Sequence, residues 1–198
     1  MIRKEDVISF FDGLAPTWDA ELVRNDAVIS AILDGAEVTA GKTVLDVACG
    51  TGVLIPDYLA RNVASVTGID ISPRMAELAR QKFPQEKVQI LCGDVEQTVF
   101  AQRFDCIMVY NAFPHFPDGG QLIASLAELL ARGGTLTVAH GMSREKIDSH
   151  HRGAACNVSN GLMLAEELAD IFASRGLLVT HCISDDAMYQ VTGRRTAD

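Results

Sequence analysis

The sequence predicts an α/β protein with one mostly parallel sheet and helices on both of its faces. From residue 43 onward, short apolar runs alternate with segments of helical periodicity, which is typical of strand–helix–strand units. The last two apolar runs, 177–184 and 188–193, are separated by three residues. A parallel crossover needs about a dozen residues or more, so these two strands must be antiparallel. We therefore expect a seven-stranded sheet with one reversed strand near the C-terminus.

Each element follows from local patterning. The first 40 residues favour helix, with a turn at Asp12-Gly13 and a helix over 19–33. Ser72 is expected to cap a helix that begins at Pro73, and Gly133-Gly134 is expected to end a helix over 120–131. The other expected helices cover 54–61, 143–151 and 164–175, and the other expected strands cover 43–48, 65–70, 88–94, 104–111 and 135–140. We divide the chain into a helical lid segment, 1–40, and a sheet domain, 41–198, as one structural unit.

Composition excludes several classes of protein. A chain of 198 residues suits a single domain, and no apolar run reaches the ~18 residues of a membrane helix. The first residues, MIRKEDVISFF, do not resemble a secretion signal. The 26 acidic residues outnumber the 17 basic ones, which disfavours nucleic acid as a partner. The five cysteines include no CxxC pair, so we expect free thiols in a reducing compartment, the cytoplasm.

The expected ligand edge lies beyond the carboxyl ends of the strands. The glycine turn at Gly50 and Gly52 directly follows the first strand, where glycine lets the backbone turn tightly and lets a ligand approach closely. A dinucleotide fingerprint would need a third glycine at the position of Ile55, which argues against a nicotinamide-dependent reductase, and no GK[ST] completes a P-loop. Asp70 lies 20 residues after Gly50 and can accept hydrogen bonds from a ribose diol.

Two further carboxylates belong to the same edge. Asp94 ends the third strand and could accept a hydrogen bond from an exocyclic amine. Asp46 lies within the first strand, where a carboxylate needs donors, so we expect it to brace the glycine turn and to reach a ligand ammonium group.

These motifs resemble those of one enzyme family. VLDVACGTG, GIDIS, GDVEQ and FDCIMVYNAFPHF are similar to successive motifs of the class I S-adenosylmethionine-dependent methyltransferases, and FFDGLAPTWD resembles the start of the ubiquinone/menaquinone-biosynthesis-like, small-molecule branch. The resemblance covers about residues 40–193 and implies a Rossmann-like domain that binds S-adenosyl-L-methionine. The cofactor-binding residues that we infer from it are Asp46, Ala48, Cys49, Gly50, Thr51, Gly52, Asp70, Ile71, Gly93, Asp94, Val95 and Asn111.

Candidate catalytic residues follow strands four and five. His115 and His140 could act as general bases, and Asn111 lies where the family's residue lines the methyl-donor site. His140, with His150 or His151 and Cys156, could instead form a metal or metalloid site, but the irregular spacing leads us to assign no metal. Aromatic residues could close over the cofactor or line the acceptor pocket: Phe10, Phe11, Trp18, Tyr110 and Phe113.

We expect methyl transfer to a small-molecule acceptor by in-line displacement. The alternatives are a non-catalytic S-adenosylmethionine-binding module and a protein or RNA methyltransferase; the acidic charge and the missing NPPY-type signature, replaced here by NAFP at 111–114, disfavour the latter. The sequence predicts no nucleic-acid partner and no membrane span, and it leaves a homodimer open.

Overall fold

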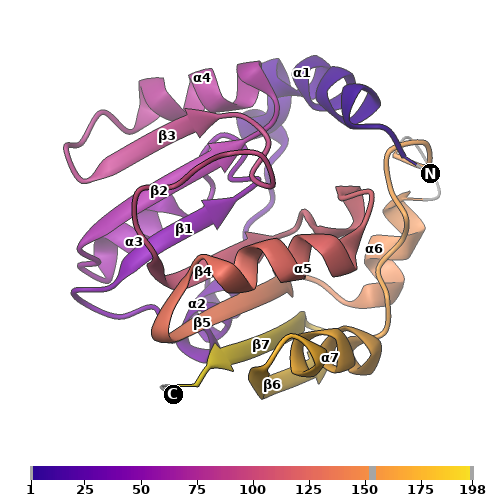
Figure 1. The fold of residues 1–198 in the computed structure, drawn as a ribbon. Coiled ribbons are helices and arrows are strands. Elements are labelled where there is room, and N and C mark those ends of the chain that lie inside the picture. Colours follow the sequence, from indigo (N-terminus) through magenta and orange to yellow (C-terminus); the bar gives the residue numbers. More distant parts are fainter. Residues whose placement is uncertain (1, 152–154, 197–198) are drawn as a thin grey trace.

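The computed structural model describes residues 2–151 and 155–196, which form one seven-stranded sheet with the order β3-β2-β1-β4-β5-β7-β6 (Figure 1). The strands pair in parallel from β3 to β5, and β7 is antiparallel to both β5 and β6, as the sequence predicted. The strands are β1 Thr43–Val47, β2 Ser65–Asp70, β3 Val88–Cys92, β4 Phe104–Tyr110, β5 Leu130–His140, β6 Leu177–Ser184 and β7 Tyr189–Arg195.

Helices cover both faces of this sheet (Figure 1). Ser72 caps α4 by accepting a hydrogen bond from Met75 N at 3.1 Å, and Pro73 is the first helical residue, as expected. The helices are α1 Lys4–Glu21, α2 Asp26–Gly35, α3 Ile55–Ala60, α4 Pro73–Lys82, α5 Gly119–Glu128, α6 Arg144–His151 and α7 Ala165–Ser174, with a short 3-10 helix, η1, at Phe113–His115.

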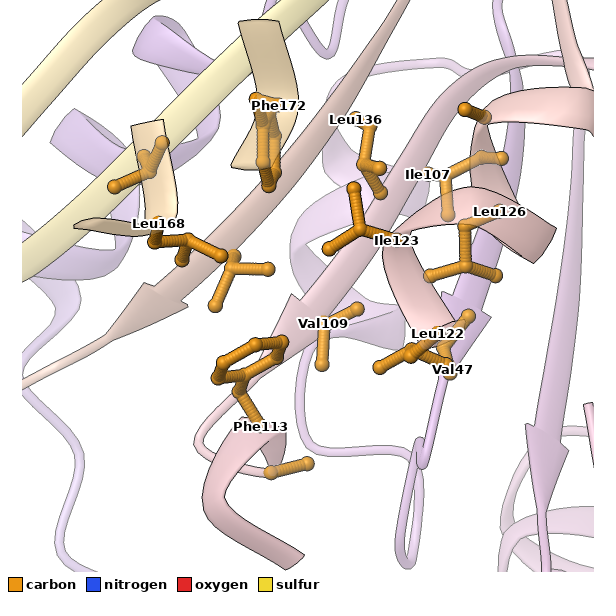
Figure 2. Packing of buried hydrophobic residues seen from close by; sticks show 14 of the residues in the cluster. Val47, Ile107, Val109, Phe113, Leu122, Ile123, Leu126, Leu136, Leu168 and Phe172 are labelled. Carbon is orange, nitrogen blue, oxygen red and sulfur yellow. The ribbon is translucent and has the colours of Figure 1, made fainter. Parts of the chain in front are cut away.

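Two apolar clusters lie on opposite faces of the sheet because side chains alternate along each strand. Ile107 and Val109 of β4 pack with α5 and α7, where Ile123 and Phe172 are fully buried (Figure 2). The neighbouring strand residues, such as Met108, face the second cluster, which includes side chains of α2, α3 and α4.

The N-terminal helices differ from the sequence prediction. The expected turn at Asp12-Gly13 is wrong, because both residues lie inside α1. Asp12 Oδ1 accepts hydrogen bonds from Ser72 Oγ at 2.5 Å and Arg74 N at 3.2 Å, so its carboxylate binds the start of α4. The helix expected over 19–33 is divided, since α1 ends at Glu21 and α2 begins after its N-cap, Asn25.

The expected role of Gly133-Gly134 is also wrong. Both glycines lie within β5, and α5 already ends at Glu128. The register between β4 and β5 shifts between Phe104 and Cys106, which pair with Leu130 and Thr135, so the pairing is irregular where the two glycines lie. A Cβ on Gly134 would lie 2.9 Å from the Asp105 carbonyl oxygen, so close backbone packing, and not helix termination, requires glycine there. Most other boundaries differ from expectation by one or two residues.

Candidate functional site

A cavity of about 970 Å³, partly open to solvent, lies at the carboxyl ends of β1, β2, β3 and β4. This is the edge where an open α/β sheet binds ligands, and β1 and β4 flank its topological switch point. The lining residues are Lys4, Val7, Phe11, Trp18, Leu22, Asp46, Ala48, Cys49, Gly50, Val53, Leu54, Asp70, Ile71, Met75, Asp94, Tyr110, Asn111, Ala112, His115, Phe116 and Pro117.

The glycine turn has left-handed backbone at alternate positions: φ is +54° at Ala48, +56° at Gly50 and +85° at Gly52. Gly50 lines the cavity. Gly52 lies behind it, where a Cβ would be 2.5 Å from Phe83 Cε2, at the end of α4. Glycine is therefore needed at Gly50 for the turn and at Gly52 for both the turn and close packing.

Asp70 links the glycine turn to α4. Its Oδ2 accepts a hydrogen bond from Gly50 N at 2.8 Å, and its Oδ1 accepts one from Ser72 N at 2.8 Å. Burial raises the pKa of Asp70 to about 6, although these two N–H groups favour the carboxylate. Each carboxylate oxygen has a second lone pair, so Asp70 can brace the turn and still accept from a ligand hydroxyl.

Asp46 and Asp94 line the cavity on either side of Asp70. Asp46 is 2% exposed, and burial, reinforced by the charge of Asp70, raises its pKa to about 8. Asp94 Oδ2 is 2.6 Å from Lys4 Nζ, which also lies 2.8 Å from Glu96 Oε2. Sequence reasoning missed Lys4, because its partners are about 90 residues away and no local pattern marks the contact.

Helix α1 is attached to three loops of the cavity edge. Besides the Lys4–Asp94 ion pair and the Asp12–Ser72 bond, Asp19 Oδ1 accepts a hydrogen bond from Thr51 Oγ1 at 2.5 Å. Of the expected lid aromatics, Phe11 and Trp18 line the cavity and Phe10 does not. Helix α2, which we also assigned to the lid segment, contributes Ile29, Ile32 and Leu33 to the core instead.

His115 lies in the cavity wall after β4, in the 3-10 helix η1. Its Nδ1 is 2.7 Å from the Val158 carbonyl oxygen, and its ring meets Phe11 edge to face with centroids 5.0 Å apart. A carbonyl oxygen only accepts, so Nδ1 is the donor in this contact, and in the neutral ring Nε2 is then the nitrogen with the lone pair. Nearby Asn111 has φ +54°, and its Oδ1 accepts from Gly141 N at 3.0 Å.

The structure does not bring every expected residue to the cavity. His140 is 2% exposed, packs edge to face on Tyr189 with centroids 6.0 Å apart, and does not line the cavity. Four expected cofactor residues also lie outside the lining: Thr51, Gly52, Gly93 and Val95.

Some residues line the cavity that the sequence analysis did not name. Met75 could have been found from the sequence, since it lies in the first turn after the Ser72 cap. The other lining residues that sequence reasoning missed are Val7, Leu22, Val53, Leu54, Ala112, Phe116 and Pro117.

Residues 2–151 and 155–196 contain neither a cluster of metal ligands nor a membrane-spanning helix. No group of three or more His, Cys, Asp or Glu side chains in this part of the chain could hold a metal ion. The side chains of His150 and His151, which the alternative metal site would use, lie outside the described residues. No helix in the same part is both long and apolar enough to cross a bilayer.

Comparison with known proteins identifies the family that this chain resembles in sequence. A family model described as "Methyltransferase domain" matches residues 44–134. The ubiquinone biosynthesis O-methyltransferase of Coxiella burnetii is 40% identical over 143 residues, which are 68% of this chain and 61% of that protein. The malonyl-[acyl-carrier protein] O-methyltransferase of Acetivibrio thermocellus is 32% identical over 139 residues, 69% of this chain and 49% of that protein. The chain thus spans about half to three fifths of the length of these relatives.

Solved structures share the fold. The partner of the Trm112 methyltransferase activator in its Haloferax volcanii complex superposes with a TM-score of 0.77 at 20% identity, over 94% of this chain and 97% of that one. The magnesium protoporphyrin IX methyltransferase of Synechocystis, solved with bound S-adenosylhomocysteine, gives a TM-score of 0.70 at 18% identity, over 98% of this chain and 100% of that one.

Fold and site together define a Rossmann-like methyltransferase domain. The chain belongs to the class I S-adenosylmethionine-dependent methyltransferases, in agreement with the resemblance seen in the sequence. Asp46, Asp70 and Asp94 all line the cavity, and their carboxyl oxygens can accept hydrogen bonds from ammonium, hydroxyl and amine groups such as those of S-adenosylmethionine.

Proposed function

We propose that this protein transfers a methyl group from S-adenosylmethionine to a hydroxyl of a small, uncharged, flat acceptor. The observation that carries the proposal is His115, which lies in the cavity wall with its Nδ1 held by the Val158 carbonyl. That contact leaves Nε2 as the proton acceptor of the ring. The two O-methyltransferases among the relatives support oxygen as the methylated atom.

The distribution of charge in the cavity supports an uncharged acceptor. Its acidic and basic lining residues, Lys4, Asp46, Asp70 and Asp94, come from α1 and from β1, β2 and the loop after β3. The half beyond β4 is lined instead by aromatic and apolar side chains, with His115 as its one titratable imidazole among the described lining residues. Aromatic and proline walls favour a flat, apolar ring: Phe11, Tyr110, Phe116 and Pro117.

Methyl transfer requires the protein to position the acceptor, to shield it from water and to supply a base. When bound, S-adenosylmethionine supplies a methyl group activated by a positively charged sulfur. The cavity walls would position the acceptor oxygen near that group. His115 Nε2 takes the hydroxyl proton as the oxygen–carbon bond forms and the sulfur–carbon bond breaks, with the bonding electrons left on sulfur. His115 then returns the proton to solvent.

Two other functions remain as alternatives. A non-catalytic S-adenosylmethionine-binding module would bind the cofactor without turnover, and a protein or RNA methyltransferase would need a macromolecular docking surface. The net charge of −9 disfavours RNA, and the aromatic wall favours a small molecule. Location in the cytoplasm, assembly as a homodimer and the division at residues 1–40 and 41–198 stay predictions.

The test is turnover of labelled S-adenosylmethionine with a panel of phenols and with a metabolite extract, with the labelled product identified by mass spectrometry. His115→Asn places an amide near Nδ1 that can still donate to Val158, but it removes Nε2. We expect turnover to fall about 10²–10⁴-fold with cofactor affinity unchanged. His181→Gln is the matched control, because His181 lies on β6, away from the cavity lining. Full turnover in His115→Asn would exclude His115 as the base, and cofactor binding without turnover of any acceptor would favour the binding module.

A further inference from the structure

Trp18 lines the cavity, and its indole nitrogen is buried and has no hydrogen-bond partner within residues 2–151 and 155–196. A buried N–H group without a partner is unfavourable by about 1–3 kcal/mol, so tryptophan nitrogens that are buried usually find an acceptor. Trp18 therefore indicates a missing acceptor at this point of the cavity.

The Trp18 side chain lies between the glycine turn and Phe11. A Cβ built on Gly50 would lie 4.0 Å from Trp18 Nε1, so the nitrogen faces the glycine turn. The ring meets Phe11 with centroids 5.9 Å apart. The next residue, Asp19, accepts the 2.5 Å hydrogen bond from Thr51 Oγ1, which attaches this part of α1 to the same turn. Trp18 is thus held against the turn and not on a loose segment.

The chemistry of the site selects the missing group. An indole N–H only donates, so its partner must be an acceptor. The methionine end of S-adenosylmethionine carries an ammonium group, which cannot accept, and a carboxylate, which can. Asp46, in the strand that leads into the turn, offers an acceptor for the ammonium group.

We propose that Trp18 Nε1–H binds the carboxylate of the methionine end of the cofactor, on the α1 side of the glycine turn. This proposal rests on the cofactor site of the proposed function and adds to it a specific donor from the N-terminal segment. It gives α1 a direct part in cofactor binding, because the helix that covers the cavity supplies one of the ligand's hydrogen bonds.

The test combines a side-chain change with a ligand change. Trp18→Phe keeps an aromatic ring against Phe11 and removes the donor. S-adenosylhomocysteine carries the carboxylate, whereas 5′-methylthioadenosine lacks the whole amino-acid end. By calorimetric titration we expect Trp18→Phe to weaken S-adenosylhomocysteine about 10- to 100-fold and to leave the 5′-methylthioadenosine affinity within about twofold. An equal loss for both ligands, or no loss for either, overturns the proposal.

A second measurement uses the unmodified protein and so does not depend on the variant folding. Trp18 is the single tryptophan of the chain, so tryptophan emission reports on this site alone. We expect S-adenosylhomocysteine to change that emission more than its decarboxylated analogue, which keeps the amine, and to bind more tightly. Equal emission changes and equal affinities overturn the role of Trp18 while the cofactor site stands. Failure of the unmodified protein to bind S-adenosylhomocysteine overturns the proposed function as well.

Discussion

Gly52 offers the sharpest test of how the glycine turn is built. Replacing Gly52 by Ala adds a Cβ 2.5 Å from Phe83 Cε2 and 2.8 Å from Ile55 Cδ1, at a residue with φ +85°. Left-handed backbone costs an alanine about 1–2 kcal/mol relative to glycine, and overpacking a well-filled site costs about 1–3 kcal/mol. We expect the free energy of unfolding to fall by about 2–4 kcal/mol, allowing for some relaxation of the Phe83 ring.

The assay is urea denaturation, with thermal unfolding as a second measure. For a chain of this size a loss of 1 kcal/mol lowers Tm by about 2–4 °C, so Gly52→Ala should lower it by roughly 5–15 °C. Gly41→Ala is the matched control, because Gly41 has φ +81° but nothing within 4 Å of its Cβ position. That variant should lose about 1 kcal/mol from backbone strain alone. Equal losses in the two variants would refute the packing argument, and a Gly52→Ala protein as stable as the parent would refute the whole account of the turn.

Three further variants test the acids and the strained residue of the site. Asp70→Ala should weaken S-adenosylhomocysteine binding at least tenfold by calorimetry, since a charged acceptor for the ribose is lost; unchanged affinity would remove Asp70 from that role. The pKa of Asp46, about 8 against an ordinary 3.8, means that the folded protein keeps a proton that the unfolded chain releases. The free energy of unfolding of the protein should therefore fall as pH rises from 5 to 8, by about 1 kcal/mol per pH unit. Asp46→Asn should make this pH dependence weaker, as measured by urea denaturation at several pH values. Ala48→Gly should raise the free energy of unfolding by about 0.5–1 kcal/mol by relieving the strain at φ +54°; a less stable variant would contradict this.

Local patterns in the sequence were sufficient for the sheet and for much of the cofactor half of the site. Alternating apolar runs located all seven strands, and a link of three residues determined the reversed pairing of the last two. Asp46, Gly50, Asp70 and Asp94 could be assigned to one edge because parallel strands bring their carboxyl ends together. These inferences succeed because strand periodicity, turn chemistry and strand direction are all encoded within a few neighbouring residues.

Contacts between distant segments decided the rest. Asp12-Gly13 has the composition of a turn, yet it lies within α1, where the Asp12 carboxylate binds Ser72 and Arg74 at the start of α4. Gly133-Gly134 has the composition of a helix end, yet it lies in an irregular part of the β4–β5 pair, where the carbonyl of Asp105 leaves no room for a side chain at Gly134.

Only the tertiary structure separated the two candidate histidines and gave α1 its role. His115 and His140 both follow a strand, but the backbone turns His115 into the cavity and packs His140 against Tyr189. The contacts of α1 with the cavity edge join residues 32 to 90 positions apart, Asp19 to Thr51 and Lys4 to Asp94. The sequence by itself therefore determined the architecture and the cofactor edge, which depend on local order along the chain. The folded structure determined which side chains share the cavity, because that depends on packing between elements that no local pattern records.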